Sequence, residues 1–218
     1  DPNNTDKYIN NPEAWEETQV LMKGILDHLG IDYVEAEGEA AFYGPKLDIQ
    51  FKNVHGKEDT IITIQIDFAL AERFDMTYID KDGNKKRPYI IHRSSIGCYE
   101  RTLAMLIEKY AGAFPTWLAP TQAIVLPISD KYNDYAESIV KDFKDSGIRI
   151  TADYRAEKIG YKIREARLER IPYILVVGEK EAANNEASVR SRKNGEEGAI
   201  PVSELKNRLI LEIANKDK

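Results

Sequence analysis

The chain has 218 residues, of which 42% are hydrophobic and 31% are charged, and its formal net charge is −6 at pH 7. This length allows one large core or two modest ones. The acidic balance excludes a chain that is basic throughout, so any nucleic-acid surface must be a local patch. The one cysteine, Cys98, excludes an internal disulfide and is typical of a reducing cytoplasm. No apolar run approaches the roughly 20 residues needed to cross a bilayer, so we expect no membrane span.

The first residues, Asp1 to Thr5, are polar and include neither a methionine nor a secretory leader. We interpret the chain as a piece cut from a longer protein. A processed mature protein is the alternative.

The first half of the chain predicts a helix, a group of antiparallel strands and a second helix. Asn11 and Pro12 are typical of a helix start, and apolar residues at helical spacing lead to a stop at Gly30. Strand-like stretches at 46–53, 60–68 and 76–80 follow, with a hairpin turn at 81–85. A second amphipathic helix follows Gly97. Strands joined by turns and flanked by helices predict an α+β domain.

Glycine and proline gather between Gly112 and Pro120, and we predict a boundary there, with domains at 1–118 and 119–218. The second domain alternates strands and helices, and a short acidic, Asn-rich segment leads to its last strand. This alternation predicts an α/β domain with a βαβ sheet covered on both faces. The predicted strands are 123–128, 148–153, 172–177 and 187–192, and the predicted helices are 130–146, 158–170 and 202–214.

Several polar side chains of the first domain are candidates for a site. Gln65 and Asp67 share one face of a strand rich in β-branched residues, because strand side chains alternate. A polar pair there costs stability unless it is partnered, so a binding site and a structural hydrogen-bond network both fit. Tyr43 and Lys46 flank a turn that is otherwise ordinary. His92 follows a strand at 89–91, and a single histidine is more often structural than a metal ligand.

Gly97 opens the second helix, with Cys98 and Arg101 close behind it. Glycine permits close backbone approach, a helix N-terminus favours an anion, and a guanidinium suits a bidentate phosphate contact. An ordinary surface turn is the alternative.

The second domain carries a local excess of bases. Between 155 and 193 ten bases face roughly six acids. In the helix predicted at 158–170, Ile159, Ile163 and Ala166 form an apolar stripe that we expect to face the core. Arg164 lies off this stripe, and such cations suit phosphates. Glu181 follows the strand predicted at 172–177, at the edge where open α/β sheets bind ligands. A solvated helix face of ion pairs is the alternative. The ten bases are Arg155, Lys158, Lys162, Arg164, Arg167, Arg170, Lys180, Arg190, Arg192 and Lys193.

Five segments carry a family resemblance. His92-Arg93, Gly97 and Glu100-Arg101 are similar to the third signature motif of class II aminoacyl-tRNA synthetases. Residues 40–46, 63–68, 114–120 and 155–165 resemble the threonyl-tRNA synthetase family in particular, and the resemblance covers nearly the whole chain. It implies a partial class II catalytic domain with an antiparallel sheet at 1–118. It also implies an α/β anticodon-binding domain with a mixed five-stranded sheet at 119–218.

The resemblance implies roles for single residues. His92 would be one of three zinc ligands, Tyr43, Gln65 and Cys98 would contact substrate, and Lys46 and Arg101 would contact ATP or the adenylate phosphate. Glu181 and Arg190 would read anticodon bases, with Lys158 and Arg164 contacting the RNA backbone. The sequence departs from the family at Cys98, usually serine, at 60–62, often Gln-Cys-Gly, and at Ala156, commonly asparagine.

The activity implied by the resemblance is ATP-dependent activation of threonine to threonyl adenylate, followed by transfer to tRNA(Thr). Zinc and magnesium with ATP would be the cofactors, and the whole protein would be a cytoplasmic homodimer. The first two signature motifs and the other zinc ligands would lie upstream of Asp1. We therefore expect this chain to be inactive alone but to retain anticodon recognition. A free-standing tRNA-binding module derived from a synthetase is the alternative, and a purely structural protein is a third possibility.

Overall fold

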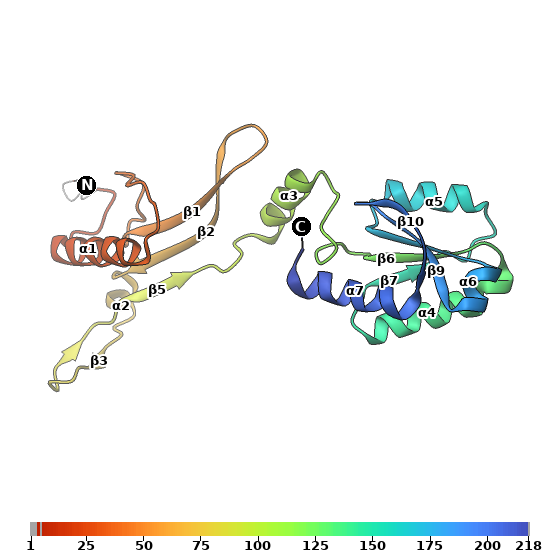
Figure 1. Ribbon diagram of the computed structural model, residues 1–218. Coiled ribbons are helices and arrows are strands. Elements are labelled where there is room, and N and C mark those ends of the chain that lie inside the picture. Colours follow the sequence, from red (N-terminus) through yellow and green to blue (C-terminus); the bar gives the residue numbers. More distant parts are fainter. Residues whose placement is uncertain (1–3, 5, 218) are drawn as a thin grey trace. The chain divides into compact units, whose positions relative to one another are not determined.

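The structure is a computed structural model that describes residue 4 and residues 6–217. Asp1 to Asn3 and Thr5, part of the polar start noted in the sequence, lie outside the described residues. The chain divides into two compact units, Asp1–Ala104 and Met105–Lys218, which are described separately below (Figure 1).

Unit 1 contains a three-stranded antiparallel sheet in the order β1-β2-β5, which confirms the predicted antiparallel strands. A two-stranded hairpin, β3-β4, surrounds the predicted turn at 81–85. His92 was predicted to follow a strand, whereas it lies inside β5, paired with Gln65 of β2. The elements are α1 (Pro12–Leu29), β1 (Lys46–Lys52), β2 (Glu58–Asp67), α2 (Leu70–Arg73), β3 (Tyr78–Ile79), β4 (Lys85–Lys86), β5 (Ile90–Arg93) and α3 (Tyr99–Tyr110), which continues into unit 2.

Helix α1 begins and ends where the sequence predicts. The Asn11 side chain accepts a hydrogen bond from the Ala14 N–H at 3.2 Å, which satisfies one of the free donors of the first turn. Gly30 ends the helix with φ of 63°, a left-handed conformation that glycine adopts without steric cost.

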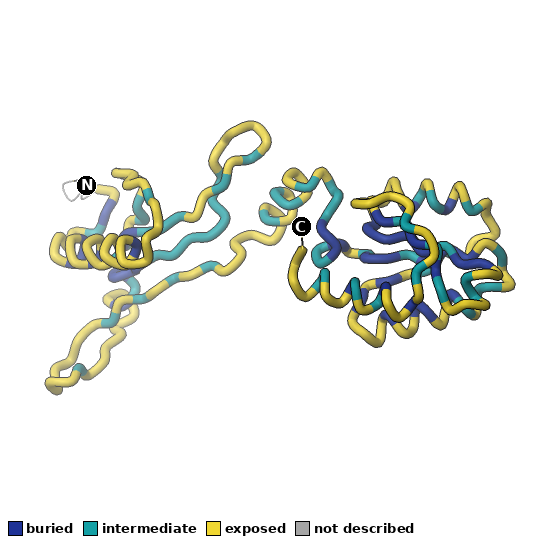
Figure 2. The backbone as a smooth tube through the Cα atoms, viewed as in Figure 1, coloured by how far each residue is buried: buried dark blue, intermediate teal, exposed yellow. Residues whose placement is uncertain are grey.

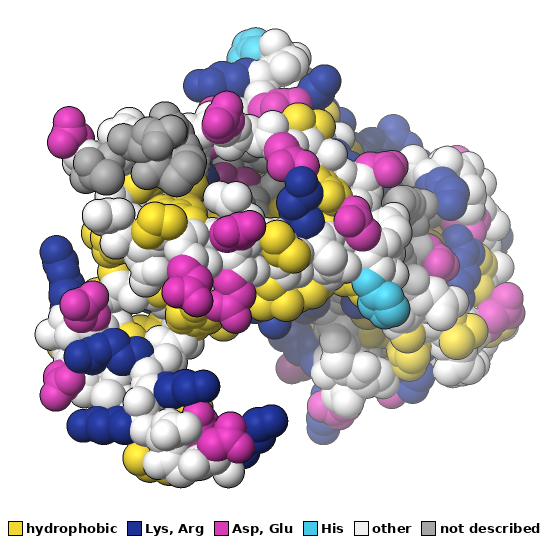
Figure 3. Space-filling view, turned by 90° about the vertical axis from the view of Figure 1, so that its left-hand side faces the viewer, with side chains coloured by type: hydrophobic (Ala, Val, Ile, Leu, Met, Phe, Trp, Pro, Cys, Tyr) yellow, Lys and Arg dark blue, Asp and Glu magenta, His cyan; other side chains and the backbone are white. Residues whose placement is uncertain are grey.

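Unit 1 has a small core. Trp15 of α1 packs edge-on against Tyr8, with ring centroids 5.6 Å apart, and against Phe68, with centroids 5.2 Å apart. Many residues of unit 1 are exposed, as the yellow stretches of the tube in Figure 2 show, and Figure 3 shows yellow hydrophobic side chains on the face toward the viewer. On α1 the exposed apolar residues are Val20, Leu21, Ile25 and Leu29.

Unit 2 holds a five-stranded sheet in the order β10-β9-β8-β6-β7. Strands β7, β6 and β8 run parallel, and β9 and β10 are antiparallel additions, so the expected mixed five-stranded sheet is confirmed. The elements are β6 (Ala123–Pro127), η1 (Asp130–Tyr132), α4 (Asn133–Asp145), β7 (Ile150–Ala152), α5 (Ile159–Leu168), β8 (Tyr173–Val177), α6 (Glu179–Asn184), β9 (Glu186–Ser191), β10 (Gly195–Pro201) and α7 (Val202–Asn215).

Helices lie on both faces of this sheet, as the alternating pattern predicts (Figure 1). Val125, Leu175 and Val189 point to one face, where they pack with Phe143 of α4 and Leu205 of α7. The opposite face packs against α5 through a second cluster of Leu126, Ala166, Ile171 and Ile174. The expected inward residues of α5, Ile159, Ile163 and Ala166, all belong to this second cluster.

Two elements of unit 2 were not predicted. Helix α6 spans only six residues, too few for a helical period to stand out in the sequence. Strand β10 contains Gly195, Gly198 and Pro201, which lower strand propensity. It pairs only with β9 at the edge of the sheet, where such residues are tolerated.

Across the described part of the chain, no helix combines the length and the apolar character that a membrane span requires.

Helix α7 offers a matched test of this architecture. Leu205 is fully buried and Leu211 is 62% exposed on the same helix. We expect Leu205→Ala to lower the free energy of unfolding of unit 2 by about 2–5 kcal/mol, because it leaves a cavity. Leu211→Ala should change it by less than about 0.5 kcal/mol. Urea unfolding followed by circular dichroism measures both, and equal effects would contradict this packing.

Candidate functional site

The turn that carries Tyr43 lies directly against β2. A Cβ atom on Gly44 would lie 1.8 Å from the Ile66 carbonyl oxygen, so only glycine fits at this position. The Ile66 N–H donates to the Pro45 carbonyl at 3.0 Å, and the Phe68 N–H donates to the Tyr43 carbonyl at 3.2 Å. This close packing lets the Tyr43 hydroxyl donate to Gln65 Oε1 at 2.5 Å.

Asp67 and His92 form the charged centre of the site. The Asp67 side chain is fully buried, whereas that of His92 is 40% exposed. Their Oδ2 and Nε2 atoms lie 2.9 Å apart, and the ring N–H donates because an ionised carboxylate only accepts. The other Asp67 oxygen accepts from the N–H groups of Ala69 at 2.8 Å and Leu70 at 3.0 Å.

These contacts set the protonation state of Asp67. Burial raises the pKa of this carboxyl, but the hydrogen bonds from His92 and from the Leu70 and Ala69 N–H groups outweigh burial and hold the pKa below its ordinary value. Asp67 is therefore ionised at neutral pH and orients the imidazole ring.

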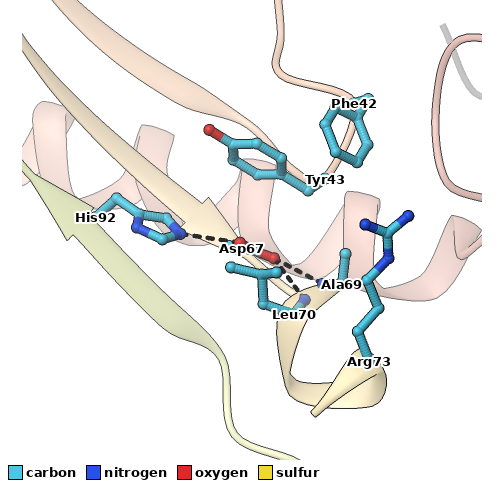
Figure 4. Close-up of a pocket in the computed structure, with 7 residues that line it drawn as sticks. All are labelled: Phe42, Tyr43, Asp67, Ala69, Leu70, Arg73 and His92. Carbon is cyan, nitrogen blue, oxygen red and sulfur yellow. Dashed lines mark hydrogen bonds and ion pairs between the residues drawn. The ribbon is translucent and has the colours of Figure 1, made fainter.

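A pocket of about 240 Å³ opens beside this pair (Figure 4). Tyr43 also stands against His92, with ring centroids 5.8 Å apart. The structure thus brings together Tyr43 and His92, which line the pocket, and Gln65, which contacts Tyr43 but does not line the pocket. The pocket is lined by Phe42, Tyr43, Asp67, Ala69, Leu70, Arg73 and His92.

Lys46 lies at the start of β1, directly across from Gln65 of β2. Its Nζ forms an ion pair with Asp48 Oδ2 at 2.6 Å, and the Thr63 hydroxyl donates to the other Asp48 oxygen at 2.8 Å. The ammonium is therefore held on the same sheet as the Tyr43–Gln65 pair.

Arg101 and Cys98 lie toward the other end of β2. A Cβ atom on Gly97 would lie 2.0 Å from the Ile61 carbonyl oxygen, and the φ of Gly97 is 69°, so this glycine permits the approach of α3 to the strand. Arg101 Nη1 donates to the Thr60 carbonyl at 2.9 Å, and the Cys98 thiol donates to Glu100 at 2.9 Å. Thr60 and Gln65 are five residues apart on β2, roughly 17 Å in an extended strand, so these residues do not join the Tyr43 pocket.

The described residues do not by themselves form a complete metal site. Among these residues no group of three or more His, Cys, Asp or Glu side chains is placed to hold a metal ion. The Asp67–His92 contact does resemble the carboxylate–histidine pairs that orient metal-bound imidazoles.

In unit 2, Glu181 and Arg190 are held at different places along the sheet. Glu181 Oε2 accepts from the Gly178 N–H at 3.0 Å and caps α6 just beyond β8. Arg190 of β9 is paired with Ile174 of β8, so its side chain lies on the face that carries α5. Its Nη2 donates to Glu196 at 2.7 Å. Glu181 and Arg190 are therefore separated by about 10 Å along β8 and are not in contact.

The basic helix face differs from the prediction at one position. Lys158, directly before α5, and Arg164, on α5, are exposed as expected. Lys162 is only 4% exposed, and its Nζ donates to the carbonyls of Pro127 at 3.3 Å and Asp153 at 2.9 Å. Lys162, one of the ten bases counted in this region, therefore adds no charge to the surface, because its ammonium is a buried donor to backbone carbonyls.

Sequence reasoning missed several partners of the named residues. Asp67 was noted only as a polar residue sharing a face with Gln65, and its pairing with His92 depends on a strand that joins distant segments. Glu196 was missed because β10 was not predicted. Leu70 and Arg73 come from the four-residue helix α2, which leaves no period in the sequence.

The Asp67–His92 pair can be tested by titration. We expect the Asp67 carboxyl to titrate below its ordinary pKa of about 3.9. His92→Ala should raise that pKa, because it removes one of the hydrogen bonds that counteract the effect of burial. The low pKa stabilises unit 1 above about pH 3.9, and this stability is lost as the pH falls through the folded value. Carboxyl carbon NMR of both forms measures the shift. An unchanged Asp67 pKa in His92→Ala would show that the pair does not form.

Two family models match successive parts of the chain. The tRNA synthetase class II core domain (G, H, P, S and T) matches residues 8–110. The anticodon binding domain matches residues 122–212.

Curated relatives match over essentially the whole chain. A threonine–tRNA ligase of Clostridium perfringens is 77% identical over 217 residues, which are 100% of this chain and 34% of that protein. A threonine–tRNA ligase of Latilactobacillus sakei is 51% identical, covering 99% of this chain and 33% of that protein. The chain thus spans about a third of the length of these relatives.

Solved structures agree with this assignment. The RNA binding domain of threonyl-tRNA synthetase from Cryptosporidium parvum matches with a TM-score of 0.83 and 37% identity, covering 93% of this chain and 52% of that chain. A putative threonyl-tRNA synthetase from Aeropyrum pernix matches with a TM-score of 0.70 and 27% identity, covering 96% of this chain and 52% of that chain. The chain therefore belongs to the threonyl-tRNA synthetase family, as a C-terminal portion that joins part of the class II core to the anticodon-binding domain.

Proposed function

We propose that this chain is part of a threonine–tRNA ligase, which activates threonine with ATP as threonyl adenylate and transfers it to tRNA(Thr). The observation that carries the proposal is the succession of a class II core region and an anticodon-binding domain in one chain, 77% identical to a ligase of that name. Unit 1 would contribute to the amino-acid and ATP sites, and unit 2 would bind the anticodon.

The pocket beside Tyr43 fits a small polar substrate. Its volume of about 240 Å³ suits an amino acid rather than a larger ligand, and the side chains that line it include the polar residues Tyr43 and Arg73 and the Asp67–His92 pair. Gln65 fixes the position of the Tyr43 hydroxyl by accepting its hydrogen bond at 2.5 Å. Tyr43 and Gln65 would therefore orient the amino acid, with Cys98 at the far end of β2 as a more distant substrate contact.

His92 fits the role of one zinc ligand. The buried Asp67 carboxylate fixes the orientation of the His92 ring and makes its other nitrogen a stronger electron-pair donor to a metal. Metal-bound histidines commonly have such a carboxylate partner. When bound, zinc would supply a Lewis acid that prefers threonine over valine, because only threonine adds a hydroxyl ligand. Further ligands would come from the remainder of the longer protein, since the described residues offer no group of three.

Arg101 and Lys46 would bind the ATP phosphates and the adenylate. Both cations are anchored to the sheet, Arg101 by the Thr60 carbonyl and Lys46 by Asp48, so each is positioned before a ligand arrives. Magnesium would accompany ATP. When the threonine carboxylate attacks the α-phosphorus and pyrophosphate leaves, cations that are already in position would stabilise the charge on the phosphate oxygens without reorganisation.

Unit 2 would recognise the anticodon of tRNA(Thr) through Glu181, Arg190, Lys158 and Arg164. Arg190 and Glu181 carry groups that read base edges, and Lys158 and Arg164 are exposed cations that suit phosphates. We propose that the domain boundary lies at 118–119, between the matched regions that end at residue 110 and begin at residue 122. The whole protein would act as a homodimer in the cytoplasm.

The chain by itself should not activate threonine. We expect no threonine-dependent ATP–pyrophosphate exchange and less than one bound zinc per chain, because the described residues hold no group of three metal-binding side chains. The full-length ligase of Clostridium perfringens serves as the positive control. Threonine-dependent turnover by this chain would contradict the expectation.

The anticodon role predicts salt-dependent binding of tRNA(Thr) by this chain. We expect Arg164→Ala combined with Arg190→Ala to weaken binding about tenfold or more, since each change removes a cation from the proposed surface. Lys141→Ala, on the exposed side of α4 across the sheet, is the matched control and should leave affinity unchanged. Equal affinities for the double variant and the control would exclude the assigned surface.

A further inference from the structure

Arg155 belongs to none of the residues assigned above, yet several contacts hold its guanidinium in one orientation. Its Nε donates to Asp153 Oδ1 at 2.9 Å, its Nη2 donates to Asp153 Oδ2 at 2.7 Å, and its backbone N–H donates to Oδ1 at 3.0 Å. The guanidinium also lies over the ring of Tyr161, 5.8 Å from the ring centroid. These contacts restrict the directions in which the exposed guanidinium can point.

Asp153 is itself fixed by hydrogen bonds of its backbone to the sheet and to α5. It follows β7, at the edge formed by the carboxyl ends of the parallel strands. Its N–H donates to the Val125 carbonyl at 3.0 Å, and its carbonyl accepts from the buried Lys162 ammonium at 2.9 Å. Its side chain is only 10% exposed. The carboxylate that orients Arg155 is therefore part of the sheet edge and not of a mobile loop.

The geometry leaves one edge of the guanidinium available. Asp153 occupies Nε and one Nη2 donor, while the Arg155 side chain remains 56% exposed. The remaining donors, on Nη1 and Nη2, form a planar fork with a fixed direction. Because the Asp153 carboxylate offsets the charge, this fork is a weaker partner for a phosphate than a free arginine is. It is well suited to a planar, neutral partner with two adjacent acceptors.

We propose that Arg155 reads the edge of an unpaired guanine in the anticodon loop, through O6 and N7, with Asp153 and Tyr161 holding the guanidinium in place. Guanine is the base that presents two adjacent acceptors to an arginine fork. Unpaired loop bases expose these edges, whereas bases in an RNA helix do not. The inference rests on the proposed tRNA-binding function and adds a base-reading residue beside Lys158, three positions further along the chain.

The test measures base preference as well as affinity. The probes are anticodon stem-loop RNAs of tRNA(Thr) in which each loop nucleotide is changed singly. The wild-type chain should prefer guanine at one loop position by about tenfold. Arg155→Ala and Arg155→Lys should both lose that preference, because lysine keeps the charge but not the fork. Lys158→Ala should instead weaken the binding of all RNAs alike. It should also reduce the slope of log affinity against log salt concentration by about one.

The outcomes separate this inference from the proposed function. A uniform loss of affinity in Arg155→Ala for every RNA, or a base preference retained by Arg155→Lys, would overturn the inference. Either result would mean that Arg155 stabilises the protein loop and does not read a base. Normal binding and preference in Arg155→Ala, with binding lost in Arg164→Ala combined with Arg190→Ala, would overturn the inference and leave the function standing. No RNA binding by the wild-type chain would overturn both. Lys141→Ala is the control throughout, and thermal unfolding confirms that each variant is folded.

Discussion

The burial of the Asp67 carboxylate is the constraint on which the site in unit 1 depends. A fully buried charge is costly unless its lone pairs are satisfied, and here three N–H donors satisfy them. The donors tie two separate parts of the chain to one point: His92 from β5, and the backbone of Ala69 and Leu70 at the start of α2. The walls formed by His92, Ala69 and Leu70 are thus held by one carboxylate, whereas Tyr43 is held by its contacts with β2.

Strand β2 extends this constraint along the unit. At one end the Gly44 turn lies against the Ile66 carbonyl and presents Tyr43, and toward the other end Gly97 lies against the Ile61 carbonyl and brings in α3 with Arg101. Neither approach has room for a Cβ atom. The length of β2 therefore sets the distance between the pocket and Arg101. The strand keeps this spacing although the apolar core of unit 1 is small.

Much of this arrangement was predictable where a local pattern carried it. Asn11 and Gly30 bound α1, alternation placed Gln65 and Asp67 on one face of β2, and the inward stripe of α5 was readable from Ile159, Ile163 and Ala166. What could not be read depends on pairing between distant segments or on elements too short for a period. The Asp67–His92 contact needs the β2–β5 register, Glu196 needs the edge strand β10, and Leu70 needs the four-residue α2. Lys162 illustrates a second limit, since composition counts a lysine as a surface charge and only the fold shows that backbone carbonyls solvate it.

Lys162 also shows that unit 2 follows the same rule as unit 1, with the sign reversed. A buried ammonium at the sheet edge gathers the carbonyls of Pro127 and Asp153, as the buried carboxylate gathers N–H groups. In each unit the buried charge supports an exposed side chain. Asp67 orients His92 directly, and Lys162 acts through Asp153, which orients Arg155. An exposed side chain alone would lose rotamer entropy on meeting a ligand, but one held from the interior has lost that entropy on folding. The fixed orientations of His92 and Arg155 therefore suit the directional contacts proposed for them, a coordination bond for His92 and a base edge for Arg155, better than recognition by charge alone.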